Sequence, residues 1–140
     1  MRDTRDMRKI RDFAAPSLAD LERIAEEALA ALPGSFRKLC EGVVIRVQDF
    51  PDDETLDAMN CISEFDLLGL FRGRGRAQSG ATPATGQFPN MVLLYRRPIL
   101  DYWAQTDNTL GEIVTHVLVH ELGHHFGLSD EDMLRIEGAA

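Results

Sequence analysis

The chain has 140 residues, and its 15 Lys and Arg against 23 Asp and Glu give a formal net charge of −8. This length predicts one domain around a single hydrophobic core. The acidic balance argues against nonspecific nucleic-acid binding as the main activity, because that activity needs a basic face to neutralise phosphates. No apolar run reaches the roughly 20 residues that span a membrane, and residues 1–16 lack the apolar stretch of a secretory signal.

The cysteine content indicates the compartment. The chain holds only two cysteines, Cys40 and Cys61, which are too few for a disulfide scaffold and lack the Cys-x-x-Cys spacing of a zinc or redox pair. We therefore expect reduced thiols that pack as small hydrophobes in a cytoplasmic protein. We also expect a monomer with no membrane partner and no nucleic-acid partner.

The N-terminal part predicts a lead-in followed by a long helix. Residues 1–16 are dominated by Arg, Asp and Lys, so we expect a mobile lead-in and place the domain at 17–140. Ser17 and Asp20 have the spacing of a capping box. Apolar residues then recur at three- and four-residue steps across Leu18–Leu32, which predicts an amphipathic helix that a Pro-Gly pair ends.

Three short apolar segments predict the strands of a small sheet, namely Val43–Val47, Leu67–Phe71 and Met91–Tyr95. A short helix is expected after the first strand and reaches about Met59. The last strand is expected either to line a cleft with its edge and bind an extended peptide, or to be ordinary core sheet. Residues 72–90 hold four Gly and two Pro, which predicts a long loop whose basic start is solvated surface.

The C-terminal third predicts one long helix between two shorter helical segments. Ile99–Ala104 is expected to form a helical turn. Thr109 and Glu112 have capping-box spacing, and a broad apolar surface continues to Gly127, a natural helix stop. A short helix is expected over Asp132–Glu137. Strands and helices mix without a β-α-β rhythm, so the predicted fold class is α+β.

All four histidines lie between positions 116 and 125. His116, His120 and His124 are spaced by four residues, which stacks them along one face of a helix. Residues 120–124 have the H-E-x-x-H pattern, in which two imidazoles one turn apart can hold one Zn²⁺. Glu121 lies on the adjoining edge and can take a proton from a metal-bound water. The pattern predicts His120 and His124 as metal ligands and Glu121 as the general base.

A third metal ligand is expected soon after this motif. Gly127 and Asp130 stand at the two steps where metzincins place a glycine and a third ligand. The glycine lets the helix end sharply, and Asp130 would complete a His₂Asp set with an open fourth position, as in catalytic zinc centres. Two alternatives stay open. Asp130 could cap the next helix instead, or the oxygen ligand could come from Glu131, Asp132 or Glu137.

Three residues around the motif have less specific interpretations. His116 is either a neighbour of the ligands or substrate, or a partly buried packing residue. His125 points off the ligand face and is interpreted as structural or surface. Gly123 costs up to about 1 kcal/mol in a helix interior relative to Ala, and its presence predicts the close approach of another backbone.

The stretch HELGHHFGLSDEDM, with MVLLYRRPI and VIRVQDFPDDE upstream, resembles a family of minimal zincin-like bacterial metallopeptidases. The resemblance implies a compact zincin fold, in which a small mixed sheet packs against the active-site helix and a backing helix, here Leu18–Leu32. It also implies zinc at His120, His124 and Asp130, with Glu121 as the general base.

Two functions are compatible with this sequence. The first is a zinc metallopeptidase that acts on a peptide or protein substrate, and an intact Glu121 favours it because a structural zinc site needs no base. The second is a zinc-binding regulatory or interaction module with little or no turnover. The second is favoured by the small size and by the lack of an evident metzincin Met-turn, since only ten residues follow Asp130 and Met133 is too close to it to be assumed equivalent. A metal-free buried histidine face is a weaker third possibility, and a His₂-carboxylate set also suits Fe(II), Mn(II) or Co(II).

Overall fold

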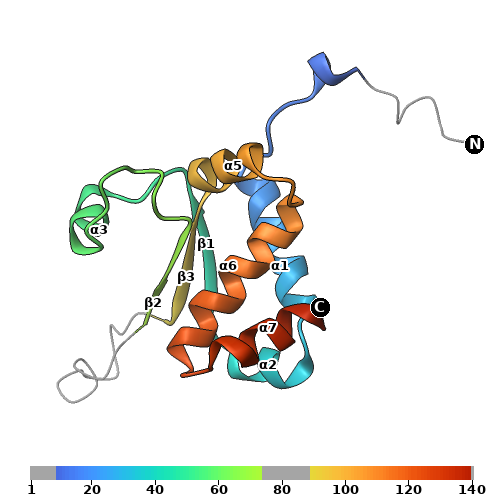
Figure 1. Cartoon of the computed structure of the whole chain (residues 1–140), viewed down its shortest axis with the longest axis vertical. Helices are drawn as coiled ribbons and strands as arrows, with labels where there is room; N and C mark the ends of the chain where they lie inside the picture. The colour runs from blue at the N-terminus through green and yellow to red at the C-terminus, as the bar shows by residue number, and fades with distance from the viewer. Residues whose placement is uncertain (1–8, 74–88, 140) are drawn as a thin grey trace, which may run out of the picture.

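The structure is a computed structural model that describes residues 9–73 and 89–139 (Figure 1). Residues 1–8 of the predicted lead-in and residues 74–88 of the predicted loop lie outside the described residues. The helices and strands are, in chain order, a 3₁₀-helix at Ile10–Asp12, α1 (Leu18–Ala31), α2 (Gly34–Leu39), β1 (Val44–Gln48), α3 (Asp53–Ala58), β2 (Gly69–Arg72), β3 (Met91–Tyr95), α5 (Arg96–Gln105), α6 (Leu110–His125) and α7 (Asp130–Gly138).

The three strands form a mixed sheet in the order β1-β3-β2. β1 runs parallel to β3, with Val44 beside Met91, and β2 runs antiparallel to β3, with Arg72 beside Met91. β3 is therefore the central strand, so the alternative that its edge lines a cleft is wrong, and the alternative that it is ordinary core sheet is confirmed. Its residues 92–95 are all buried, which is typical of a strand covered on both faces. The strand with an open edge beside α6 is β2.

Two helices cover one face of this sheet (Figure 1). α1 packs on β1 and on α6, while α6 packs on β2 and β3. The buried residues between the helices and the sheet include Leu21 and Ala25 of α1, Val92 and Leu94 of β3, and Val114, Val117, Leu118 and Leu122 of α6. This arrangement confirms the predicted α+β class, with α1 as the backing helix.

Side-chain caps fix where the two long helices begin. Ser17 and Asp20 form the predicted capping box at α1, with backbone-to-side-chain distances of 2.9 and 3.1 Å. Thr109 and Glu112 do the same at α6, at 2.8 and 3.1 Å. Both predictions are confirmed. Among the described residues, none of the helices is long and apolar enough to cross a membrane.

Three short helices differ from their predictions. The Pro33-Gly34 pair does end α1, but α2 begins at Gly34 itself and was not predicted. α5 is a ten-residue helix rather than a single turn, because Pro98 lies in its first turn, where a missing N–H costs no helical hydrogen bond. α7 begins at Asp130 rather than Asp132, because Ser129 is the residue that caps it.

Both cysteines are free, as predicted. Cys40 is buried in the core, and burial raises the pKa of its thiol to about 11. Cys61 is partly buried. The Cys40 side chain therefore stays protonated at neutral pH and packs as a small hydrophobe.

Candidate metal centre on the histidine helix

The end of α6 turns the chain back along the helix. Gly127 has a φ of +75°, the left-handed conformation that glycine adopts without strain. The N–H of Gly127 donates to the carbonyl of His124 at 3.1 Å, and the N–H of Leu128 donates to the carbonyl of Gly123 at 2.9 Å. These two bonds make a Schellman motif. α7 starts shortly after Gly127 and packs against α6, as the glycine in the sequence pattern predicts.

Met133 of α7 packs directly under the H-E-x-x-H segment. This side chain is fully buried, and a Cβ at Gly123 would collide with its Sδ and lie 2.8 Å from its Cγ. Gly123 therefore permits a close approach, but to the Met133 side chain and not to another backbone as predicted. The Met133 side chain thus lies against the H-E-x-x-H segment at Gly123.

Replacing Gly123 with Ala is expected to lower the free energy of unfolding by about 1–3 kcal/mol, because the new methyl group overpacks a fully buried contact. Gly111 is the matched control in the same helix, since a Cβ there would meet nothing within 4 Å. Gly111→Ala should leave stability unchanged or raise it slightly. Urea unfolding of both variants checks this, and an equal effect of the two substitutions would contradict the packing account.

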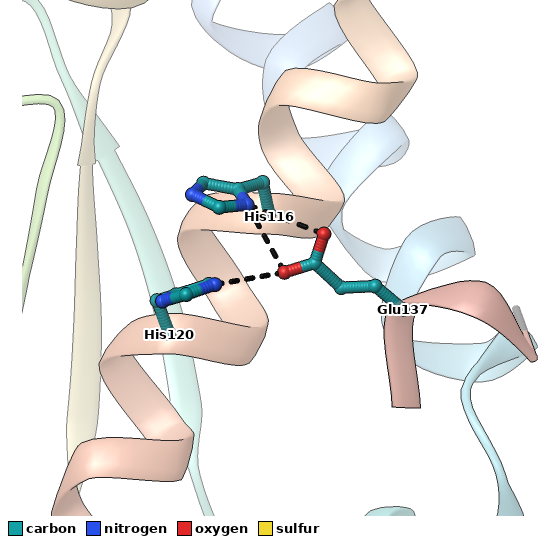
Figure 2. Close-up of side chains that lie close together, drawn as sticks. All are labelled: His116, His120 and Glu137. Carbon is teal, nitrogen blue, oxygen red and sulfur yellow. Dashed lines mark hydrogen bonds and ion pairs between the residues drawn. The ribbon is translucent and has the colours of Figure 1, made fainter. Parts of the chain in front are cut away.

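Three potential ligand side chains meet on the face of α6 that α7 covers (Figure 2). His116 Nδ1 lies 3.0 Å from Glu137 Oε1 and 3.2 Å from Oε2. His120 Nε2 lies 2.9 Å from the same Glu137 Oε1. The rings of His116 and His120 are tilted against each other with centroids 3.9 Å apart. Among the described residues, this is the group of three His, Cys, Asp or Glu side chains whose ligand atoms all lie within 4.8 Å of one another.

Two atoms of this cluster are buried without a hydrogen bond. His120 Nε2 and Glu137 Oε1 are 2.9 Å apart, yet their geometry is not that of a hydrogen bond, and neither atom has another such partner within the described part of the chain. A buried nitrogen and a buried carboxylate oxygen that lack hydrogen bonds lower the free energy of unfolding. A divalent cation accepts electron pairs from both atom types. The residues around His120 therefore fit a metal ion.

Glu121 lies on a different side of α6, against the sheet. Its Oε1 accepts a hydrogen bond from the backbone N–H of Phe71 in β2 at 3.1 Å. Burial raises the pKa of the Glu121 carboxyl group, while the Phe71 hydrogen bond and the charges of His124 and His120 lower it. Glu121 thus interacts electrostatically with the two motif histidines. The Phe71 bond uses only one carboxylate oxygen, so the other remains to accept a proton.

The open edge of β2 lies beside Glu121. Tyr95 N–H donates to the carbonyl of Leu68 at 3.0 Å. Hydrogen-bonded pairs alternate in an antiparallel ladder, so Gly69 and Phe71 direct their backbone groups away from β3. Gly69 also lets β2 approach α6, because a Cβ there would lie 2.5 Å from Val117 Cγ1.

The remaining motif residues are exposed. The His124 ring meets the edge of the His120 ring with centroids 5.9 Å apart. Asp130 is the first residue of α7 and is exposed, and Ser129, not Asp130, caps that helix. The structure therefore brings His120 together with His116 and Glu137, rather than with His124 and Asp130 in one group.

The sequence indicated the places of the other site residues to different extents. The four-residue spacing of the histidines indicated a place for His116 on the ligand face, whereas nothing in the sequence distinguished Glu137 from the other carboxylates of α7. His125 stacks on the Phe71 ring at 3.9 Å and is exposed, in line with its structural or surface interpretation. A groove of about 930 Å³ between α1 and α6 reaches His116 and Glu137.

Comparison with known proteins agrees with this architecture. The profile of a family described as zincin-like metallopeptidases matches residues 40–140. The solved structure of a conserved hypothetical protein from Thermus thermophilus is similar, with a TM-score of 0.54 and 19% sequence identity. The similarity covers 79% of this chain and 94% of that chain, and it shows a shared fold. No curated protein matches the sequence. Because the family profile spans β1 to α7 and includes the whole histidine helix, the chain belongs to the zincin-like metallopeptidase family.

Proposed function

We propose that the protein is a zinc-dependent peptidase that hydrolyses peptide bonds in a peptide or protein substrate. The observation that carries the proposal is the pairing of two features on adjoining sides of α6. The rings of His120 and His124 lie one helical turn apart with centroids 5.9 Å apart, and Glu121 is held at the sheet edge through one carboxylate oxygen, which leaves the other to take a proton. The family described as metallopeptidases supports the same conclusion.

His120 and His124 would hold the zinc ion, with Asp130 as the third ligand. When bound, zinc supplies a positive charge that polarises the substrate carbonyl and lowers the pKa of water. Glu121 is the general base. Its free carboxylate oxygen takes a proton from the attacking water and passes it to the leaving amine. The Phe71 N–H keeps the Glu121 carboxylate in place during both transfers.

The substrate would bind along β2. An extended peptide can add to an open strand edge through main-chain hydrogen bonds, which need no particular side chains. At this edge the carbonyl of Phe71 can accept such a bond, while the Phe71 N–H donates to Glu121. This geometry would bring the scissile bond to the general base.

We further propose that the catalytic domain spans 17–140 and acts as a cytoplasmic monomer without a membrane or nucleic-acid partner. The net charge of −8 and the two free thiols support this assignment.

The test compares two carboxylates in the first turn of α7. Asp130→Ala should lower kcat/KM for peptide cleavage at least about tenfold, because it removes a zinc ligand. Glu131→Ala, the neighbouring exposed carboxylate, should leave it unchanged. Cleavage of a broad peptide library by the zinc-loaded variants measures both.

Equal rates for the two variants would remove Asp130 from the ligand set. A zinc-loaded protein that cleaves no library member would instead favour the second candidate, a zinc-binding regulatory or interaction module with little or no turnover.

A further inference from the structure

We propose that His116 and His120 of α6 and Glu137 of α7 form a second metal position. This position binds a divalent cation such as Zn²⁺ at a distance from Glu121. The first position is the proposed zinc site of His120, His124 and Asp130. The proposal rests on the proposed function only in that the two positions share His120. A single ion can therefore occupy one position or the other, and occupancy of the second position leaves the general base without an adjacent metal.

The ligand atoms of this cluster are of the types that bind zinc. His116 contributes Nδ1, His120 contributes Nε2, and Glu137 contributes a carboxylate, all within 4.8 Å of one another. Imidazole nitrogen and carboxylate oxygen are the donors that zinc takes in open tetrahedral sites. The residues come from two helices, so the packing of α7 on α6 builds the site before any ion arrives (Figure 2).

The cluster also contains two buried atoms that lack a hydrogen bond among the described residues. His120 Nε2 and Glu137 Oε1 face each other at 2.9 Å without hydrogen-bond geometry, and both are buried. An ordinary structural ion pair would be expected to align its N–H with the oxygen. A shared cation satisfies both atoms without that alignment.

The two positions lie on different sides of His120. Glu121 is held against β2 by the Phe71 N–H, whereas His116 lies one helical turn before His120 and contacts Glu137 of α7. The side chain of His116 is 56% exposed, and the groove between α1 and α6 reaches both His116 and Glu137. An ion in solvent therefore has a route to this second position that does not pass Glu121.

The experiment separates the two positions by removing a ligand that only the first one uses. Zinc is titrated into His124→Ala, His124→Ala/Glu137→Gln and His124→Ala/Glu131→Gln, with a chromophoric chelator as competitor. His124→Ala should still bind about one zinc ion per chain. Adding Glu137→Gln should weaken that binding at least about tenfold, while Glu131→Gln, an exposed carboxylate of the same helix, should not.

His124→Ala/His116→Ala provides an independent variant, because His116 is exposed and its loss does not threaten folding. It should weaken zinc binding to a similar extent. The proposal is overturned if His124→Ala binds no zinc, or if neither Glu137→Gln nor His116→Ala changes its affinity. Because all these variants lack His124, the outcome does not depend on whether the wild-type protein cleaves peptides.

Discussion

Glu121→Gln is expected to lower kcat/KM for peptide cleavage by about two to four orders of magnitude, the usual contribution of a general base. Glutamine keeps the size of the side chain, and its amide oxygen can still accept the Phe71 N–H. The side chain therefore stays in place but can no longer take a proton. Fold and zinc content should remain those of the wild type, because Glu121 is not a ligand in either metal position.

The measurement is the rate of library-peptide cleavage together with zinc content, and Glu131→Gln is the matched control because its carboxylate is exposed on α7. A Glu121→Gln protein that keeps wild-type activity would show that another group acts as base. A variant that loses its zinc as well as its activity would show that Glu121 binds metal directly.

His120→Ala is expected to have the largest effect on zinc binding of any single substitution. His120 belongs to both the His120, His124 and Asp130 set and the His116, His120 and Glu137 set, so its removal leaves each position with two ligands. Substitution at any other proposed ligand spares one position. His125→Ala is the matched control, because this histidine lies near the end of the same helix but stacks on Phe71.

The elements that the sequence predicted well are those whose signals are local. A capping box depends on two side chains three residues apart, and both predicted boxes are present at α1 and α6. β3 has the predicted bounds, Met91–Tyr95, because its apolar run is short and ends where α5 begins. The reversal at Gly127 was predictable since its left-handed φ favours glycine.

The features that the sequence did not predict depend on tertiary packing. A buried apolar run does not say whether a strand is central or at the edge, so the sequence left both alternatives open for β3 and did not identify β2 as the edge beside Glu121. α2 begins at the glycine of the Pro33-Gly34 pair, although the local signal of that pair is only that of a helix end.

Among the site residues, Glu137 was one of three alternative oxygen ligands, and the sequence did not single it out. It lies seventeen residues after His120 in the sequence, and it reaches His120 only because Met133 seats α7 against Gly123. No local pattern contains that contact.

The measurement that tests the central claim most directly is zinc content and peptide cleavage on the same samples of wild-type, His120→Ala and His125→Ala protein. The proteins are purified without immobilised metal, stripped with chelator and reloaded with zinc, and their metal is counted by elemental mass spectrometry. The account predicts about one zinc per chain and zinc-restored cleavage in wild type and His125→Ala, and neither in His120→Ala. Cleavage that survives complete removal of zinc, or a His120→Ala protein that still binds zinc like the wild type, would contradict a metal-dependent peptidase centred on His120.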